Sequence, residues 1–123
     1  MRIDRVMARA YSAPERMDDL VAFYEKLFGQ KCEIRFPIPA LGLEIASVGG
    51  MHLMAGTDDN LKPFRAAQAT YWVDSVSAAA EELRRAGGEV LLGPNTGASG
   101  SFMVAKHPDG LVVEYIDRRR VDE

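Results

Sequence analysis

The chain has 123 residues, of which 47% are hydrophobic and 27% charged, and its formal net charge is −3 at pH 7. This composition is too apolar for a disordered protein, and the acidic balance argues against a protein that mainly binds nucleic-acid phosphates. The basic run at 118–120 is flanked by acidic residues, which favours a solvated tail over a nucleic-acid or membrane patch.

Cysteine content and hydropathy indicate the cellular environment. Cys32 is the only cysteine, so neither an intrachain disulfide nor a cysteine-based zinc cluster can form. The N-terminal residues alternate charged and apolar side chains, unlike a signal peptide. The most apolar stretch, 37–56, is interrupted by prolines, glycines and polar residues, unlike a membrane span. We therefore expect a cytoplasmic protein with no nucleic-acid or membrane partner.

The first half of the chain predicts a strand, a helix and three further strands. Residues 2–10 alternate as a strand does, and a capping-box pattern at Ser12–Glu15 precedes a helix that ends at Gly29. Pro37, Pro39 and the pair Gly49-Gly50 indicate breaks between the strands that follow. Those strands are predicted at 31–36, 43–48 and 51–55.

The second half predicts the same series after a polar, turn-rich linker at about 56–66. Asp74 and Ser75 provide a cap region for its helix, which closes at Gly87-Gly88. The glycine-rich segment 93–101 predicts a loop, because it matches neither a phosphate-binding loop nor a dinucleotide fingerprint. The elements expected are a strand at 68–73, a helix at 76–86, and strands at about 89–92, 101–106 and 111–116.

An internal repeat connects the two halves. The helix end at Gly29 has a counterpart at Gly87, 58 positions later, and Met54 has a counterpart at Glu114, 60 positions later. A doubled βαβββ unit explains both offsets. We predict a single domain over 1–123, with modules at about 1–55 and 67–117.

Three segments resemble the vicinal oxygen chelate superfamily, which includes glyoxalases, bleomycin-resistance proteins and extradiol dioxygenases. They are LVAFYEKLFG at 20–29, WVDSVSAAAEELRRAGGEV at 72–90, and HPDGLVVEYI at 107–116. The resemblance implies an α+β fold in which two βαβββ modules form a curved mixed sheet, a cup, with the helices packed outside. It predicts the fold more closely than the reaction, because this fold supports many activities.

The resemblance also implies where a metal ion would bind, on the first and last strand of each module. These positions fall on Arg5 (or Met7, if the first strand shifts by two residues), Met54, Gln68 and Glu114. Only Glu114 is a good ligand for a hard divalent ion, and His52, on the face of Met54, adds one more at most. We therefore expect no metal, no other cofactor and no catalytic residue, and we expect Arg5 to pair with Glu114.

Aromatic, thioether and polar side chains on the faces of these strands are typical of a pocket for a flat organic ligand. The leading hypothesis is metal-free sequestration of a small aromatic molecule by a homodimer, as in antibiotic-resistance binding proteins. One alternative is a metal-dependent glyoxalase-like lyase, isomerase or dioxygenase with an altered ligand set; another is a structural member whose cup is filled by side chains. The expected ligand contacts are Trp72, His52, Glu114, Gln68, Met54, Arg5 and Met7.

Overall fold

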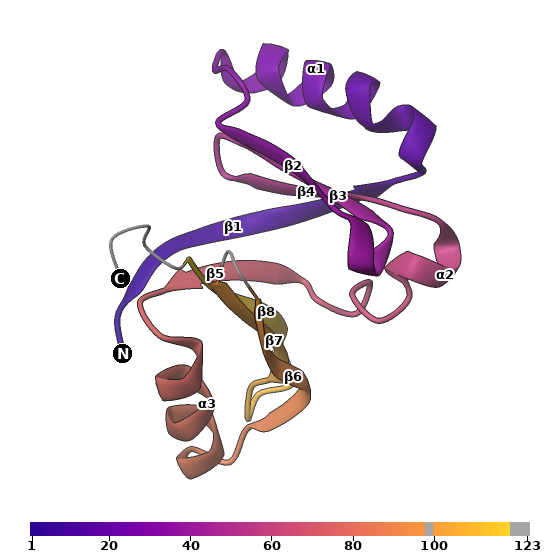
Figure 1. Cartoon of the computed structure of the whole chain (residues 1–123). Coiled ribbons are helices and arrows are strands. Elements are labelled where there is room, and N and C mark those ends of the chain that lie inside the picture. The colour runs from indigo at the N-terminus through magenta and orange to yellow at the C-terminus, as the bar shows by residue number, and fades with distance from the viewer. Residues whose placement is uncertain (98–99, 119–123) are drawn as a thin grey trace. The chain divides into compact units, whose positions relative to one another are not determined.

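The computed structural model describes residues 1–97 and 100–118, which form two compact units (Figure 1). One unit is Met7–Arg65, and the other combines Met1–Val6 with the chain from Ala66 onward. The first strand, β1 (Ile3–Ser12), is therefore divided between the two units. None of the helices in the described ranges is long and apolar enough to cross a membrane.

The Met7–Arg65 unit is a four-stranded mixed sheet with α1 (Met17–Phe28) along one face (Figure 1). The strand order is β2-β3-β4-β1. β1 pairs in parallel with β4, and the other neighbours are antiparallel. The strands that follow α1 are β2 (Ile34–Ile38), β3 (Leu43–Val48) and β4 (Met51–Ala55).

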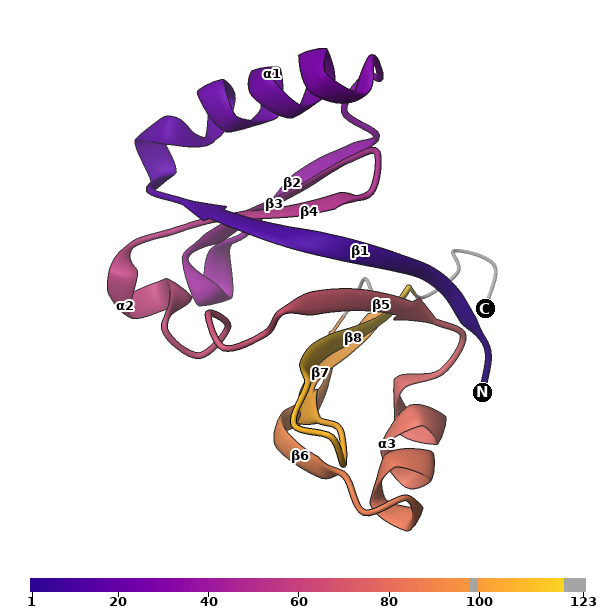
Figure 2. The same ribbon diagram turned by 180° about the vertical axis from the view of Figure 1, so that it is seen from behind.

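The second unit repeats this arrangement around α3 (Val76–Arg85), as the view from behind shows (Figure 2). Its strand order is β5-β8-β7-β6, with β5 parallel to β8 and the other pairs antiparallel. Its strands are β5 (Ala69–Val73), β6 (Glu89–Gly97), β7 (Gly100–Lys106) and β8 (Val112–Arg118). The predicted α+β class and the two βαβββ modules are confirmed.

Helix α1 forms because its apolar residues recur at helical spacing and bury one side. Met17 and Val21 pack on the strand residues Ala46 and Leu53, and burying side chains of this size contributes about 1.5–3 kcal/mol each. The helix ends at Gly29, whose φ of 65° is a conformation that other residues adopt at a cost.

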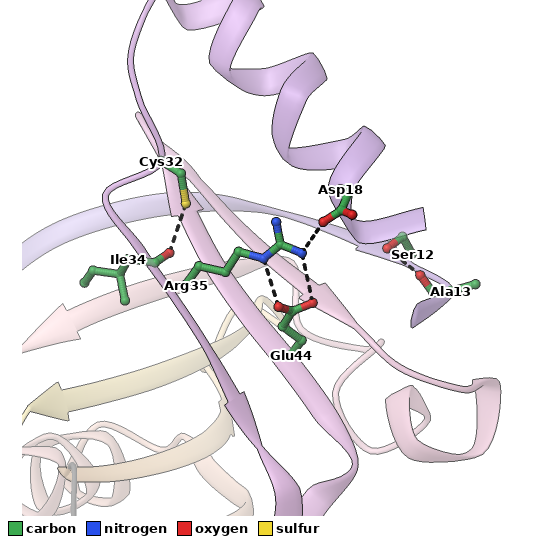
Figure 3. Close-up of polar contacts among 7 residues, drawn as sticks. All are labelled: Ser12, Ala13, Asp18, Cys32, Ile34, Arg35 and Glu44. Carbon is green, nitrogen blue, oxygen red and sulfur yellow. Dashed lines mark hydrogen bonds and ion pairs between the residues drawn. The ribbon is translucent and has the colours of Figure 1, made fainter. Parts of the chain in front are cut away.

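An arginine also ties α1 to the sheet beneath it (Figure 3). Arg35 on β2 donates from Nε to the Glu44 carboxylate on β3 at 2.8 Å. Its Nη2 reaches the Asp18 carboxylate in the first turn of α1 at 2.6 Å. Because the guanidinium is partly exposed, these pairs fix the position of the helix more than they stabilise the fold.

Helix α3 is capped as the sequence predicts. The Ser75 hydroxyl accepts from the backbone N–H of Ala78 at 3.1 Å. The Asp117 carboxylate on β8 accepts from Val76 N–H at 2.7 Å and, with its other oxygen, from Ser101 N–H at 2.9 Å. Asp117 thus holds the start of the helix and the start of β7 together.

Two hydrogen bonds between Arg2 and Asp74 tie the beginning of the chain to this same unit. The Arg2 N–H donates to the Asp74 carboxylate at 2.8 Å. The Asp74 N–H donates back to the Arg2 carbonyl at 3.1 Å. These bonds connect residues that are 72 positions apart in the sequence.

The predicted capping box at Ser12 is wrong. The Ser12 hydroxyl donates to the neighbouring Ala13 carbonyl at 3.0 Å, and a single 3-10 turn, Pro14–Arg16, precedes α1. Ala13 stands at the cap position of that turn and makes no side-chain bond. The strand therefore continues through Ser12, two residues beyond the predicted end, which keeps the hydroxyl away from the helix.

The strand predicted at 31–36 is displaced toward the C-terminus: β2 spans Ile34–Ile38. Cys32 N–H donates to the Glu25 carboxylate at 2.7 Å, which keeps it out of a strand ladder, so β2 begins at Ile34. Pro37, predicted as a break, lies inside β2 opposite Glu44. Within this unit β2 is an edge strand, where the missing N–H of proline is tolerated.

The linker and the glycine-rich segment are also more ordered than predicted. Thr57 caps a short helix, α2 (Asp58–Leu61), whose Leu61 is fully buried. Asn60 on α2 donates to the Gly42 carbonyl at 3.3 Å. β6 continues to Gly97, and its pairing with β7 has two register shifts that accommodate the turn-forming residues. Positions 98–99 of the predicted loop lie outside the described residues.

Candidate functional site

In each unit, strand alternation separates an apolar face under the helix from a second face that carries polar side chains. In the Met7–Arg65 unit, Ala10, Ala46 and Leu53 pack under α1. Their neighbours along the strands point the other way. We call this second face the helix-distal face of the unit; it carries Met7, Arg9, Tyr11, Ile45, Ser47, His52 and Met54.

A row of polar residues crosses this face. Ser47 on β3 is directly opposite His52 on β4, and His52 is in register with Arg9 on β1. Ser47 and His52 are 3% and 2% exposed. The Ser47 hydroxyl makes no hydrogen bond within the described ranges, although a buried hydroxyl normally has a partner.

The protonation state of His52 follows from its surroundings. Burial removes the hydration that the imidazolium needs, and the nearby Arg9 guanidinium disfavours a second positive charge. Together they lower the pKa of His52 from 6.5 to about 3. His52 is therefore a neutral imidazole at physiological pH, and each ring tautomer has one donor and one acceptor nitrogen.

Arg9 and Tyr11 form a hydrogen-bonded pair at the end of this face. Arg9 Nε donates to the Tyr11 hydroxyl at 2.8 Å, which donates in turn to the Phe64 carbonyl at 2.7 Å. Arg9 Nη2 lies 3.9 Å from the Met54 sulfur. The Arg9 and Arg65 guanidinium carbons lie 5.2 and 5.5 Å from the Tyr11 ring centroid, within cation–π range.

The helix-distal face of the other unit carries three of its polar or aromatic side chains close together in register. Val113 and Tyr115 pack toward α3, so Glu114 points away from it. Glu114 is 4% exposed and lies opposite Thr70, which is fully buried. Trp72 is half-buried two residues further along β5, with the Arg118 guanidinium carbon 5.8 Å from its ring centroid.

Gln68 and Arg5 differ from the other predicted site residues. Gln68 is exposed and precedes β5; its N–H donates to the Val112 carbonyl at 2.8 Å, and its side-chain oxygen accepts from Val112 N–H at 3.2 Å. The side chain therefore extends the β5–β8 pairing by one rung. Arg5 is half-buried on β1, and its pairing with Glu114 stays a prediction.

The structure thus distributes the predicted site over two faces. Met7, His52 and Met54 share the helix-distal face of the Met7–Arg65 unit, and the even spacing of His52 and Met54 along β4 predicts that these two share a face. Trp72 and Glu114 share that of the second unit. Arg9 was expected on the same face as Arg5 and Met7 but not among the ligand contacts, and Tyr11 was not predicted; its position four residues after Met7 was the available signal.

A divalent metal ion, which the family resemblance implies, does not suit these side chains. Within the described ranges no three His, Cys, Asp or Glu residues are grouped as a metal site requires. The Met54 sulfur lies beside the positive Arg9 guanidinium, and the Gln68 oxygen already accepts a backbone N–H. Glu114 is the one anionic side chain at the four implied positions.

His107 has a more specific environment than a solvent-facing turn residue. Its Nε2 lies 2.6 Å from the Tyr115 hydroxyl, and the Tyr71 and Tyr115 rings meet edge to face with centroids 5.3 Å apart. Burial, with a smaller contribution from Tyr71, raises the pKa of Tyr115 to about 12. Tyr71 and Tyr115 pack with the core beneath α3, away from the helix-distal face.

Comparison with known proteins places this geometry in a family. The model of the Glyoxalase/Bleomycin resistance protein/Dioxygenase superfamily matches residues 2–115. No curated protein matches the chain. A crystal structure of an uncharacterised protein from Methanosarcina mazei is 36% identical, with a TM-score of 0.86, and the match covers 98% of this chain and 97% of that one.

Two solved epimerase structures share the fold at lower identity. Methylmalonyl-CoA epimerase from Mycobacterium tuberculosis is 18% identical with a TM-score of 0.68, over 96% of this chain and 88% of that one. The Streptomyces coelicolor methylmalonyl-CoA epimerase in complex with 2-nitronate-propionyl-CoA is 21% identical with a TM-score of 0.64, over 98% and 96%. The chain belongs to the Glyoxalase/Bleomycin resistance protein/Dioxygenase superfamily.

Proposed function

We propose that this chain binds a small, aromatic organic molecule without a metal ion and holds it unchanged, in the manner of an antibiotic-resistance binding protein of the cytoplasm. The supporting observation is the position of the buried polar side chains. In the described part of the chain these are Ser47, His52, Thr70 and Glu114, and all four lie on helix-distal faces. Burying a polar group costs free energy that an apolar residue would avoid, so a binding role explains their retention.

Each helix-distal face also offers apolar side chains to a ligand. Trp72 offers a ring for stacking, and Met7 and Met54 offer flexible thioethers that adapt to the shape of a ligand. His52 and Glu114 would orient polar groups of the ligand. Of the remaining proposed contacts, Arg5 supplies positive charge, and Gln68 supplies its amide NH₂, because its oxygen accepts from the Val112 backbone.

The alternative is a metal-dependent lyase, isomerase or dioxygenase with an altered ligand set. Glu114 favours this reading, because a carboxylate that is 4% exposed is a candidate proton acceptor. The epimerase that was solved with an acyl-CoA analogue has the same fold, so acyl-CoA thioesters are a second class of compound to test.

Trp72 permits a direct test, because it is the only tryptophan in the chain. Its fluorescence would be titrated with aromatic antibiotics, aromatic metabolites and acyl-CoA thioesters, and each hit would be confirmed by calorimetry. We expect at least one aromatic compound to bind at one equivalent per chain and to be recovered unchanged by mass spectrometry. Trp72→Phe should retain calorimetric binding better than Trp72→Ala, because the phenylalanine ring still stacks.

Metal addition separates the two functions. The proposal predicts that Zn²⁺, Mn²⁺ or Ni²⁺ changes neither the affinity nor the recovered compound. Chemical conversion of a bound compound, with or without added metal, would refute sequestration. Failure of every compound in the panel to bind would favour the structural alternative.

A further inference from the structure

Helix α1 exposes large apolar side chains that nothing in its own unit covers. Phe23 is 57% exposed and Leu27 is 65% exposed, although both belong to a helix whose other side is buried. They are four residues apart, so they are neighbours on one helix face. Leu20, which is half-buried, lies three residues before Phe23 on the edge of the same face.

This face has a symmetric arrangement around Phe23. Asp19 and Leu20 lie one turn before Phe23, and Lys26 and Leu27 lie one turn after it. A two-fold axis through Phe23 would therefore place Asp19 of one copy beside Lys26 of another, and Leu20 beside Leu27. Each pairing is offset by one residue, which is about 1.5 Å along the helix. The face is complementary to itself in both charge and apolar surface.

The direction of the helix matters for this complementarity. A parallel pair of α1 helices would bring Asp19 and Lys26 beside the leucines of the partner, so that neither charge meets an opposite charge. The Asp19 side chain is 79% exposed and has one weak neighbour, Arg16, at 3.9 Å. It is therefore accessible to a partner, since an exposed pair at that distance contributes little.

We propose that two copies of this chain associate through antiparallel α1 helices centred on Phe23. Phe23, Leu20 and Leu27 of each copy form the apolar centre, and Asp19 of each copy pairs with Lys26 of the partner, one pair at each end of the contact. The inference identifies an interface for the homodimer expected from the sequence. It does not depend on the proposed ligand binding.

The size of the face sets the expected strength. The 12 residues of α1 span about 18 Å, so their exposed stripe covers less than the roughly 800 Å² per partner of a standard interface. We therefore expect a dissociation constant on the order of micromolar rather than nanomolar. Sedimentation velocity from about 1 to about 100 µM should show a shift from monomer to dimer.

Charge exchange at Asp19 and Lys26 is the sharpest test. Asp19→Lys alone, or Lys26→Asp alone, places like charges together twice in the dimer, and each should weaken association by about tenfold. The double variant, Asp19→Lys with Lys26→Asp, restores both pairs and should return the dissociation constant to near that of the unmodified chain. The matched control exchanges Glu81 and Arg85 on α3, which form a similar exposed pair at 3.7 Å and should not affect association.

Removal of the apolar centre is the second test. Phe23→Ser should leave the chain monomeric at all concentrations, while its melting temperature stays close to that of the unmodified chain, because the side chain is exposed. Leu91→Ser, at another exposed apolar position, is the control and should still dimerise. A chain that is monomeric throughout, a Phe23→Ser variant that dimerises normally, or a double charge variant as weak as the single ones would each overturn the proposal.

Discussion

Acid should destabilise this protein through one buried side chain, His52. The pKa of His52 is about 3 in the folded chain, whereas an unfolded chain restores it to about 6.5. Between these two pKa values His52 is protonated in the unfolded chain and neutral in the folded chain. The free energy of unfolding therefore falls as the pH falls below 6.5. Relative to neutral pH, the loss is about 2 kcal/mol at pH 5 and about 3 kcal/mol at pH 4. Below pH 3 both states are protonated and this loss stops increasing.

Urea unfolding at a series of pH values would measure the effect. Other groups also titrate in this range, so the informative quantity is the difference between the unmodified chain and His52→Met, which has no proton to bind. That difference should change by about 2 kcal/mol between pH 7 and pH 5, in the direction that favours His52→Met in acid. His107→Gln should leave the acid loss due to His52 in place. A difference that stays constant across this range would show that folded His52 accepts a proton readily, and the argument from burial would be wrong.

Three further predictions concern stability. Asp117→Asn should lower the free energy of unfolding by about 1–3 kcal/mol in chemical denaturation, because the carboxylate accepts two backbone N–H groups. Gly42→Ala should destabilise the fold more than Gly29→Ala. The two glycines have nearly the same φ, 64° and 65°, but only at position 42 would the added methyl group overlap the Asn60 side-chain amide, which donates to the Gly42 carbonyl. Arg5→Met should destabilise more than Arg5→Met combined with Glu114→Gln, because a lone buried carboxylate is costlier than none; the reverse order of melting temperatures would rule out that pairing.

Local patterns predicted α1 and α3, because each of these helices depends on neighbouring residues, whereas α2 was predicted as part of a linker. The stripe beginning at Met17 and the stop at Gly29 define α1 without any distant partner. The start of β2 was missed because it depends on the Glu25 carboxylate, which takes the Cys32 N–H from seven residues away. The end of β6 was missed because its bulged, glycine-containing pairing has no regular period.

In the candidate site too, positions set by local patterns were predictable and those set by distant partners were not. The shared face of Met7, His52 and Met54 was predictable, since strand parity and the repeat require only counting. The roles of Arg9 and Tyr11 were not, because their anchor is a backbone carbonyl at Phe64, more than fifty positions away. Side-chain chemistry alone cannot identify such an anchor, because every residue has a carbonyl.

The division of β1 between two units has a consequence for synthesis on the ribosome. The Met7–Arg65 unit becomes complete while the chain is still growing, but the first six residues belong with partners that are made later. Arg2 precedes its partner Asp74 by 72 positions, which is about 4–14 s at usual elongation rates. During that interval the segment 1–6, with the apolar Ile3 and Val6, lacks the partners of its own unit and is available to chaperones.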